Sequence, residues 1–270
     1  MTSPTTTAEP GPARLSPRKK RQLIRGVQYV VLGAAALFLA FYTDWKSLAL
    51  FVQPEVAEKT LPDLFTIALK NTIIYSVGGF ILSFVFGLLL ALMKLSEVRP
   101  YRWIANIYIE IFRGLPALLV FVLLNFLPLA LPGFEVPGGT YGLAILGLGL
   151  IGTAYQAEIF RAGLQAVPKG QTEAARSLGM SPMRAQFTVV IPQAIRIVIP
   201  PTTNQFVALL KDSSLVLFLG VSSGFVELAK FGNDVASENA NPTPIMVAGL
   251  TYLLVTIPLG YLARRLEKRR

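Results

Sequence analysis

The chain contains no cysteine and no histidine among its 270 residues. Without cysteine there is neither a disulfide framework nor a thiol nucleophile. Without both residues, a structural zinc site lacks its usual ligands and the commonest general base is missing. Charged residues make up only 15% of the chain, compared with about 25% in an average soluble domain. These shortages argue against a disulfide-stapled secreted scaffold, a zinc protein and a thiol- or histidine-dependent enzyme.

Apolar residues, in contrast, make up 53% of the chain, and its mean hydropathy is +0.56. This composition excludes disorder as a description of the whole chain, because disordered chains have low hydrophobicity. The 25 Lys and Arg outnumber the 15 Asp and Glu, which gives a formal net charge of +10. Such an excess also suits a nucleic-acid partner. The positions of the charges along the chain distinguish a nucleic-acid-binding protein from a membrane protein.

Long stretches without any charged residue indicate a membrane protein. A transmembrane helix needs about 20 mostly apolar residues. Five charge-free windows have about this length. A sixth span is predicted at about 188–209, where Arg196 is the one charge. The uncharged run 213–226 is too short for a span and predicts a re-entrant or interfacial segment. The sequence therefore predicts an all-α, polytopic membrane protein with six spans. The five charge-free windows are residues 26–43, 71–93, 114–134, 136–157 and 239–263.

Lys and Arg gather on alternate sides of these predicted spans. The segments that flank the spans fall into two sets, which alternate along the chain. One set contains 18 of the 25 basic residues, and the other contains 5. By the positive-inside rule the basic set is cytoplasmic, which places both termini inside the cell. The net charge is then an orientation signal and a contact with membrane lipid, and no nucleic-acid partner is expected. The basic set comprises residues 1–26, 94–103, 158–187 and 264–270, and the other comprises 44–70, 128–140 and 210–243.

The first predicted span is either a cleaved signal peptide or a retained transmembrane helix. A basic run at residues 18–21 precedes an apolar stretch with three alanines at 34–36, which suits a cleaved signal peptide. The long leader and the continuation of the apolar run to Tyr42 favour a retained helix at 26–43. We expect a disordered basic leader at 1–25 and an external loop at 44–62.

The chain matches one nucleotide-binding pattern and lacks another. Residues 147–152 match G-x-G-x-x-G, but they lie inside an apolar window, where small residues permit close packing of membrane helices. The chain contains no G-x-x-x-x-G-K-[ST] sequence and therefore no P-loop. No catalytic residue and no metal ligand set is predicted in this chain.

The segment 158–187 is the most informative of the predicted cytoplasmic segments. Residues 171–178 favour a short helix, Gly179 suits its left-handed C-terminal cap, and Ser181 followed by Pro182 starts the next helix. Glu173 and Arg176 fall on its exposed face, and the small Ala174 and Ala175 permit close approach. The elbow is either a docking knob for a soluble partner or an interfacial helix that joins two spans.

These residues resemble the EAA signature of the permeases of ATP-binding-cassette importers. That signature is E-A-A, three residues, G, nine residues, I, one residue, L-P, and here Val189 and Ile191 replace its Ile and Leu. Leu115 likewise departs from the usual small residue of an R-G-T-P element. The flanks resemble the polar-amino-acid uptake branch, and the resemblance covers about residues 63–266. The matching segments are residues 113–116, 154–161, 169–171, 173–175, 191–194, 200–204 and 210–215.

The resemblance implies a five-helix permease core at 63–266, with a coupling loop at about 158–192 and a basic tail at 267–270. The helix at 26–43 is an addition to that core. The implied partners are a cytoplasmic ATPase dimer that holds ATP and Mg, a second permease subunit, identical or related, and an extracytoplasmic amino-acid-binding protein. The implied location is the bacterial plasma membrane. The implied coupling residues are Glu173, Ala174, Ala175, Arg176 and Gly179.

Polar groups within or beside the spans are candidates for a translocation path, because ionisable groups in a membrane are costly to bury. Glu110 and Arg113 lie three residues apart on one helix face and are expected to pair, as path residues or as an interfacial salt bridge. The neutral candidates Asn71, Thr72, Thr203 and Asn204 also suit helix–helix hydrogen bonds, the last two beside an expected helix break at Pro200 and Pro201. Lys211 and Asp212 are expected at the outer mouth.

The alternative function is ion-coupled secondary transport of small polar solutes. Such a transporter is expected to have inverted internal repeats and intramembrane acids. We find no repeat, and Glu110 is the clearest acid within a span. A structural scaffold is not excluded by the composition.

Overall fold

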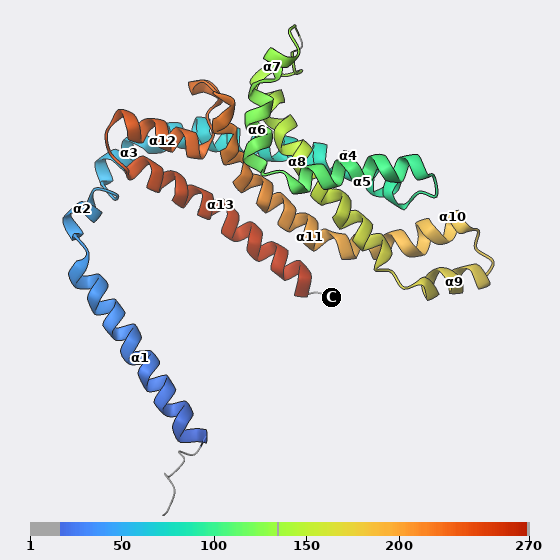
Figure 1. The fold of residues 1–270 in the computed structure, drawn as a ribbon, viewed down its shortest axis with the longest axis horizontal. Coiled ribbons are helices and arrows are strands. Elements are labelled where there is room, and N and C mark those ends of the chain that lie inside the picture. The colour runs from blue at the N-terminus through green and yellow to red at the C-terminus, as the bar shows by residue number, and fades with distance from the viewer. Residues whose placement is uncertain (1–16, 134, 269–270) are drawn as a thin grey trace, which may run out of the picture. The chain divides into compact units, whose positions relative to one another are not determined.

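The computed structural model describes residues 17–133 and 135–268, and every regular element within them is a helix (Figure 1). Most of the predicted leader lies outside these residues. Two compact units, residues 1–49 and 50–270, are described separately below. The helices are α1 (Pro17–Tyr42), α2 (Trp45–Ala49), α3 (Pro54–Asp63), α4 (Lys70–Leu95), α5 (Arg99–Gly114), α6 (Ala117–Asn125), α7 (Leu127–Ala130), α8 (Gly139–Gln165), α9 (Lys169–Ser177), α10 (Pro182–Ala185), α11 (Ile191–Asp212), α12 (Leu228–Glu238) and α13 (Thr243–Lys268).

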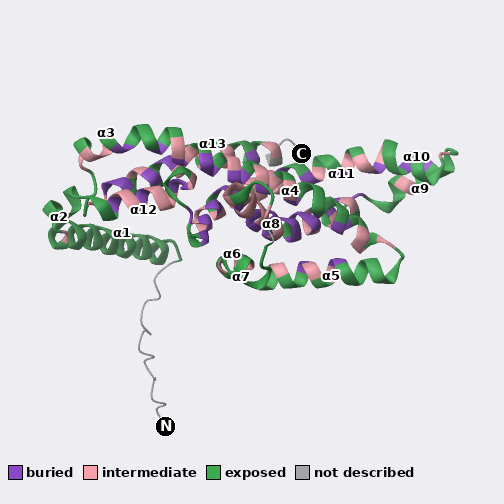
Figure 2. Cartoon of the chain, turned by 90° about the horizontal axis from the view of Figure 1, so that it is seen from above, coloured by how far each residue is buried: buried purple, intermediate pink, exposed green. Residues whose placement is uncertain are grey.

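The first unit contains α1 and α2. No residue of α1 is buried (Figure 2), which suits an apolar helix surrounded by lipid. Because α1 begins at Pro17, residues 17–25 are helical, and the prediction of a disordered leader up to residue 25 is wrong for them. Proline is favoured in a first helical turn, and the Lys, Arg, Gln and Leu that follow are good helix formers.

The predicted external loop at 44–62 is largely helical, which corrects the sequence interpretation. Helix α3 starts with Pro54 and continues through a π-helical turn, η1 (Leu64–Leu69), into α4. Pro62 has no N–H to donate, and the wider turn follows it directly. The charges of this segment argue against a span, but they do not prevent a helix.

The core of the second unit is the close packing of α4 on α8. A Cβ atom added at Gly79 would lie 2.5 Å from the Leu148 Cβ, and one at Gly152 would lie 2.8 Å from the Ser83 Cβ. Gly152 is the last glycine of the G-x-G-x-x-G pattern, so this pattern serves helix packing, as the sequence indicated. Two candidate spans thereby lie backbone to backbone.

The predicted span at 114–134 is not one straight helix. Helix α5 ends at Gly114, Leu115 is extended, and α6 departs at 99° to α5. The cause is Pro116, which disfavours the helical conformation of the residue before it and then caps α6. A charge-free window records length and polarity, and it contains no information about such a bend.

Most of the predicted span at 188–209 lies in α11, which a π-helical turn, η2 (Gln186–Val190), joins to α10. It runs through Pro200 and Pro201 without a break, contrary to our expectation. Two 3₁₀ turns, η3 (Ser213–Leu219) and η4 (Ser223–Phe225), follow it. By length and hydropathy, the described residues contain four candidate spans, or five if α5 and α6 cross together, and α11 is not among them.

Candidate functional site: a helical elbow and a polar hollow

The elbow after α8 has the predicted architecture. Helix α9 ends in a Schellman motif, in which the Gly179 N–H donates to the Arg176 carbonyl (3.0 Å) and the Met180 N–H donates to the Ala175 carbonyl (3.2 Å). Gly179 has a φ of +83°, a conformation that favours glycine. The Ser181 Oγ then accepts a hydrogen bond from the Arg184 N–H and caps α10.

The outward surface of the elbow combines charge with unpaired apolar area. Glu173, Ala174 and Arg176 are exposed, whereas Ala175 is buried against the rest of the chain. Leu178 is 82% exposed although it follows a well-formed helix. Held at a well-formed cap, this apolar side chain is available for contact with a partner. Sequence reasoning overlooked Leu178, whose signal was its position directly before the capping glycine.

A polar hollow of about 410 Å³ lies between the end of α5 and α8. Glu110 and Arg113 line it, as do Lys94, Tyr155 and Glu158. Within the described residues Glu110 and Arg113 form no ion pair, so the expected salt bridge between them is absent. Instead the Arg113 guanidinium lies 5.8 Å from the centre of the Tyr155 ring, as in a cation–π contact.

Glu158 is the charged centre of this hollow. Its Oε1 lies 2.7 Å from the Lys94 Nζ of α4, and its Oε2 lies 2.7 Å from an Arg161 guanidinium nitrogen. The pairs are partly exposed, so their main effect is to fix the side chains rather than to add stability. Sequence reasoning did not select Lys94 or Glu158. Lys94 lies at the end of α4, and Glu158, its partner, is distant from it in the sequence.

A second hollow, of about 500 Å³, continues from the first toward α11. The two share Arg113, Tyr155 and Glu158, and the second adds Pro201 and Gln205. The predicted path residues Thr203 and Asn204 belong to the same stretch of α11 but do not line either hollow. The Thr203 hydroxyl donates to the Ile199 carbonyl within its own helix (2.9 Å).

Asn71 and Thr72, two other predicted path residues, are buried and hold the segment before α12 against α4. The Asn71 amide donates to the carbonyls of Gly224 (3.0 Å) and Val226 (2.9 Å). The Thr72 hydroxyl accepts a hydrogen bond from the Leu228 N–H (3.1 Å). In this conformation the two residues fasten one segment to another, which agrees with the alternative of structural hydrogen bonds.

Lys211 and Asp212 end α11, where Lys211 is exposed and Asp212 is half-buried. Burial raises the pKa of the Asp212 carboxyl above its ordinary value, and the neighbouring Lys211 charge opposes this rise.

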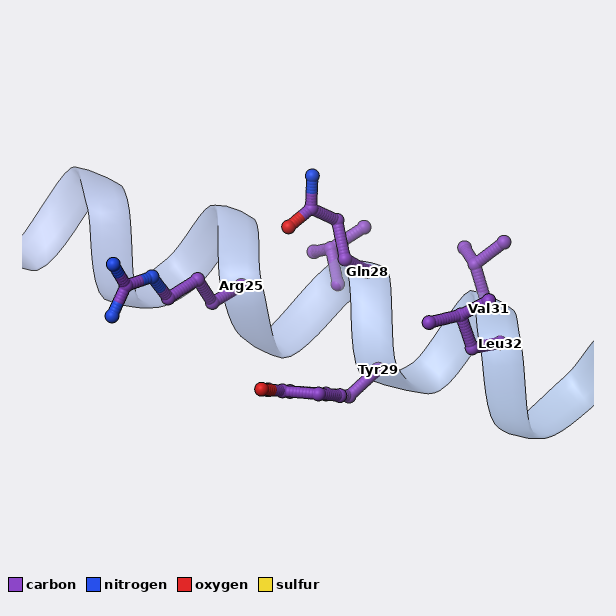
Figure 3. Close-up of a pocket in the computed structure, with 6 residues that line it drawn as sticks. Arg25, Gln28, Tyr29, Val31 and Leu32 are labelled. Carbon is purple, nitrogen blue, oxygen red and sulfur yellow. The ribbon is translucent and has the colours of Figure 1, made fainter. Parts of the chain in front are cut away.

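Another hollow lies along α1, beside Arg25 and Tyr29 (Figure 3). It is formed by a single helix, so it encloses no ligand site.

Glu227 is a buried carboxyl that sequence reasoning overlooked. It caps α12 by accepting hydrogen bonds from the N–H groups of Ala229 (2.6 Å) and Lys230 (2.7 Å), and it also accepts one from the Tyr252 hydroxyl of α13 (2.8 Å). Burial outweighs these bonds and raises the pKa of Glu227 from 4.5 to about 7. Its polar contacts join the segment before α12 to α13.

The raised pKa predicts a pH-dependent stability. Between pH 4.5 and about 7 the folded chain retains a proton on Glu227 that the unfolded chain releases, so the stability falls as the pH rises through this window. We expect Glu227→Gln to reduce this loss. Thermal unfolding of the detergent-purified protein at pH 5 and pH 8 measures it. An equal loss in the wild type and the variant would contradict the assignment.

The chain matches a known family of membrane transport proteins. The sequence profile of the family described as "Binding-protein-dependent transport system inner membrane component" matches residues 83–270. This match covers more than half of the chain. The protein is a polytopic membrane permease, and it belongs to this family. The prediction of an all-α, multi-pass permease is confirmed.

Individual relatives agree with the family. The probable glutamine ABC transporter permease GlnM of Bacillus subtilis is 40% identical over 207 residues, which are 73% of this chain and 91% of the relative. The L-cystine permease TcyB of the same organism is 33% identical over 74% of this chain and 86% of its own length. A crystal structure of an amino acid ABC transporter with histidines matches with a TM-score of 0.71 and 32% identity, and the match covers 81% of this chain and 99% of that chain. Nothing in these similarities favours ion-coupled transport.

Proposed function

We propose that this chain is a permease subunit of an ATP-driven importer that moves polar amino acids into the cell. The observation that carries the proposal is its similarity, at 32 to 40% identity, to permeases named for cystine, glutamine and arginine and to an amino acid transporter of known structure. The proposed complex contains two permease subunits, identical or related, an ATPase dimer and an external binding protein. ATP and Mg are bound by the ATPase.

The proposed topology follows the distribution of basic residues. Both termini face the cytoplasm, the helix added before the core is retained in the membrane, and the elbow faces the ATPase. The membrane is the bacterial plasma membrane. In this orientation, both the basic start of α1 and the elbow lie on the cytoplasmic side.

The elbow is the proposed coupling surface. Glu173 and Arg176 supply opposite charges for the ATPase, and Ala174 lets the surfaces approach closely. The exposed Leu178 fills an apolar depression on the ATPase, and Gly179 fixes the direction in which Leu178 points. Ala175 anchors α9 from its buried face. A movement of the ATPase would thereby be transmitted to α8 and α11 at the two ends of the elbow.

The polar hollow is the proposed part of the translocation path within this chain. An amino acid carries a carboxylate and an ammonium group, and it needs partners of both signs close together. Arg113 presents donors for the carboxylate, while Glu110 presents acceptors for the ammonium group, and both line one hollow. Lys211 and Asp212 remain proposed contacts at the outer mouth, and Thr203 and Asn204 remain proposed contacts deeper in the path.

Reconstitution tests the proposal as a whole. The permease is placed in liposomes with its ATPase and binding protein, and uptake of radiolabelled glutamine, arginine, glutamate and cystine is measured. We expect uptake of at least one of them that requires ATP, the ATPase and the binding protein. Uptake that persists without the ATPase and follows an imposed ion gradient would favour the secondary transporter instead.

Charge reversal tests the coupling surface. We expect Glu173→Lys to reduce uptake by about tenfold or more, because a favourable charged contact with the ATPase, worth about 1.5–3 kcal/mol, becomes repulsive. Glu97→Lys, an equally exposed reversal on the same predicted side, is the matched control and should leave uptake near the wild-type rate. Uptake and membrane yield are measured together. Equal uptake by both variants would contradict docking through Glu173.

A further inference from the structure

An apolar groove of about 530 Å³ runs along the outside of three helices in the second unit. Residues between Phe84 and Leu92 of α4 form one wall, and residues between Ile191 and Thr202 of α11 form the other. Phe160 and Leu164 of α8 complete its lining. Nearly every side chain in this groove is a hydrocarbon, so water gains no hydrogen bonds there.

The few polar groups of the groove do not change its character. The Thr202 hydroxyl accepts a hydrogen bond from the Gln156 amide (2.8 Å) and is thereby satisfied from within the protein. Gln186 lies at the opposite end, near the elbow. The apolar walls include Ile195, which is 53% exposed in the chain. A ligand of this groove must therefore be a hydrocarbon over most of its length.

A third hollow of about 620 Å³, with a mixed lining that includes the apolar Leu95, Val167 and Val190, adjoins the elbow end of this groove. The two share Leu92, Leu164 and Gln186, so they are continuous. The hollow adds Lys169 at the start of α9 and the polar side chains of Ser96, Gln165 and Thr172. Within the described residues Lys169 forms no ion pair. A hydrocarbon groove therefore opens onto hydrogen-bond donors and a single cation.

The length of the groove fits one leaflet of a bilayer. From Ile191 to Thr202 the rise along α11 is about 16 Å at about 1.5 Å per residue. Half of a hydrocarbon core of about 30 Å is about 15 Å. The groove thus has the length of one leaflet, and the end that carries polar side chains lies beside the coupling elbow. An acyl chain with a phosphate headgroup has this size and this order of polarity.

We propose that an anionic phospholipid of the cytoplasmic leaflet binds here, with an acyl chain in the groove and its phosphate beside Lys169. The proposal rests on the orientation proposed above, in which the elbow faces the cytoplasm. A bound lipid would join α4, α8 and α11 to the start of α9. The lipid composition of the membrane would then influence how the elbow is held against its partner.

Photolabelling tests this site in the assembled complex. Vesicles of equal phosphatidylglycerol and phosphatidylcholine receive a trace of either lipid with a diazirine on its acyl chain. We expect labelling concentrated on the peptides that carry Phe84–Leu92 and Phe187–Ile199, with phosphatidylglycerol favoured about fivefold, the effect of one lysine near an anionic surface. Lys169→Gln should remove that preference, whereas Arg99→Gln, another exposed basic residue of the same predicted side, should not.

A filled groove supplies the second test. Ile195→Trp is expected to remove labelling from the groove peptides without affecting labelling of the exposed apolar residues of α13, such as Leu250. Equal labelling of the groove and of α13 with no headgroup preference would overturn the proposal in favour of bulk lipid. Absence of groove labelling together with crosslinks to another subunit would overturn it in favour of a protein occupant. Neither outcome bears on whether the complex imports amino acids.

Discussion

Replacing Gly179 by proline is expected to abolish amino-acid uptake while leaving the chain inserted in the membrane. Gly179 has a φ of +83°, whereas proline fixes φ near about −65°, so the cap of α9 must change direction. Gly179 also donates its N–H to Arg176, and proline has no N–H to donate. The exposed Leu178 would then point away from the ATPase.

Gly179→Asn is the matched control. A Cβ atom at this position meets no other atom within 4 Å, so the cost of a side chain lies in the backbone conformation alone. Asparagine tolerates the left-handed region better than other residues, and we expect it to retain most of the uptake. Uptake, ATPase activity and protease protection are measured on the same vesicles. Normal uptake by Gly179→Pro would exclude a coupling role for the elbow geometry.

The elbow was predictable because its signals are local. A helix-favouring run, a glycine at the cap and a Ser-Pro start are all read within a dozen residues, and the structure has each in its expected place. The same applies to the close packing at Gly152, where small residues in an apolar stretch have one common use in membranes. Such features depend on neighbours in the sequence and on little else.

The interactions of Asn71 and Lys94 depend on contacts between distant segments. Asn71 is buried because a segment about 150 residues later presents carbonyls to it. Lys94 and Glu158 form their ion pair across 64 positions. A single sequence records the polarity of these residues, but it does not record which partners the fold brings to them.

Replacing Arg113 by glutamine is expected to lower uptake by about tenfold or more. A hydrogen-bonded contact with a charged group is worth about 1.5–3 kcal/mol, and about 1.4 kcal/mol corresponds to tenfold in affinity. Arg113 lines both the polar hollow and the second hollow and lies over Tyr155, so its guanidinium is held toward the space where a carboxylate would pass.

Arg113→Lys separates charge from geometry. Lysine keeps the positive charge but loses the planar fork that binds a carboxylate through two hydrogen bonds, so we expect an intermediate loss of uptake. Arg99→Gln, at the other end of α5, controls for a general loss of basic charge. Amino-acid affinity of the binding protein should be unchanged in every case, because the altered residue lies in another subunit. If Arg113→Gln imports at the wild-type rate, the hollow is outside the path, and the Lys94–Glu158 ion pair serves only to hold α4 against α8.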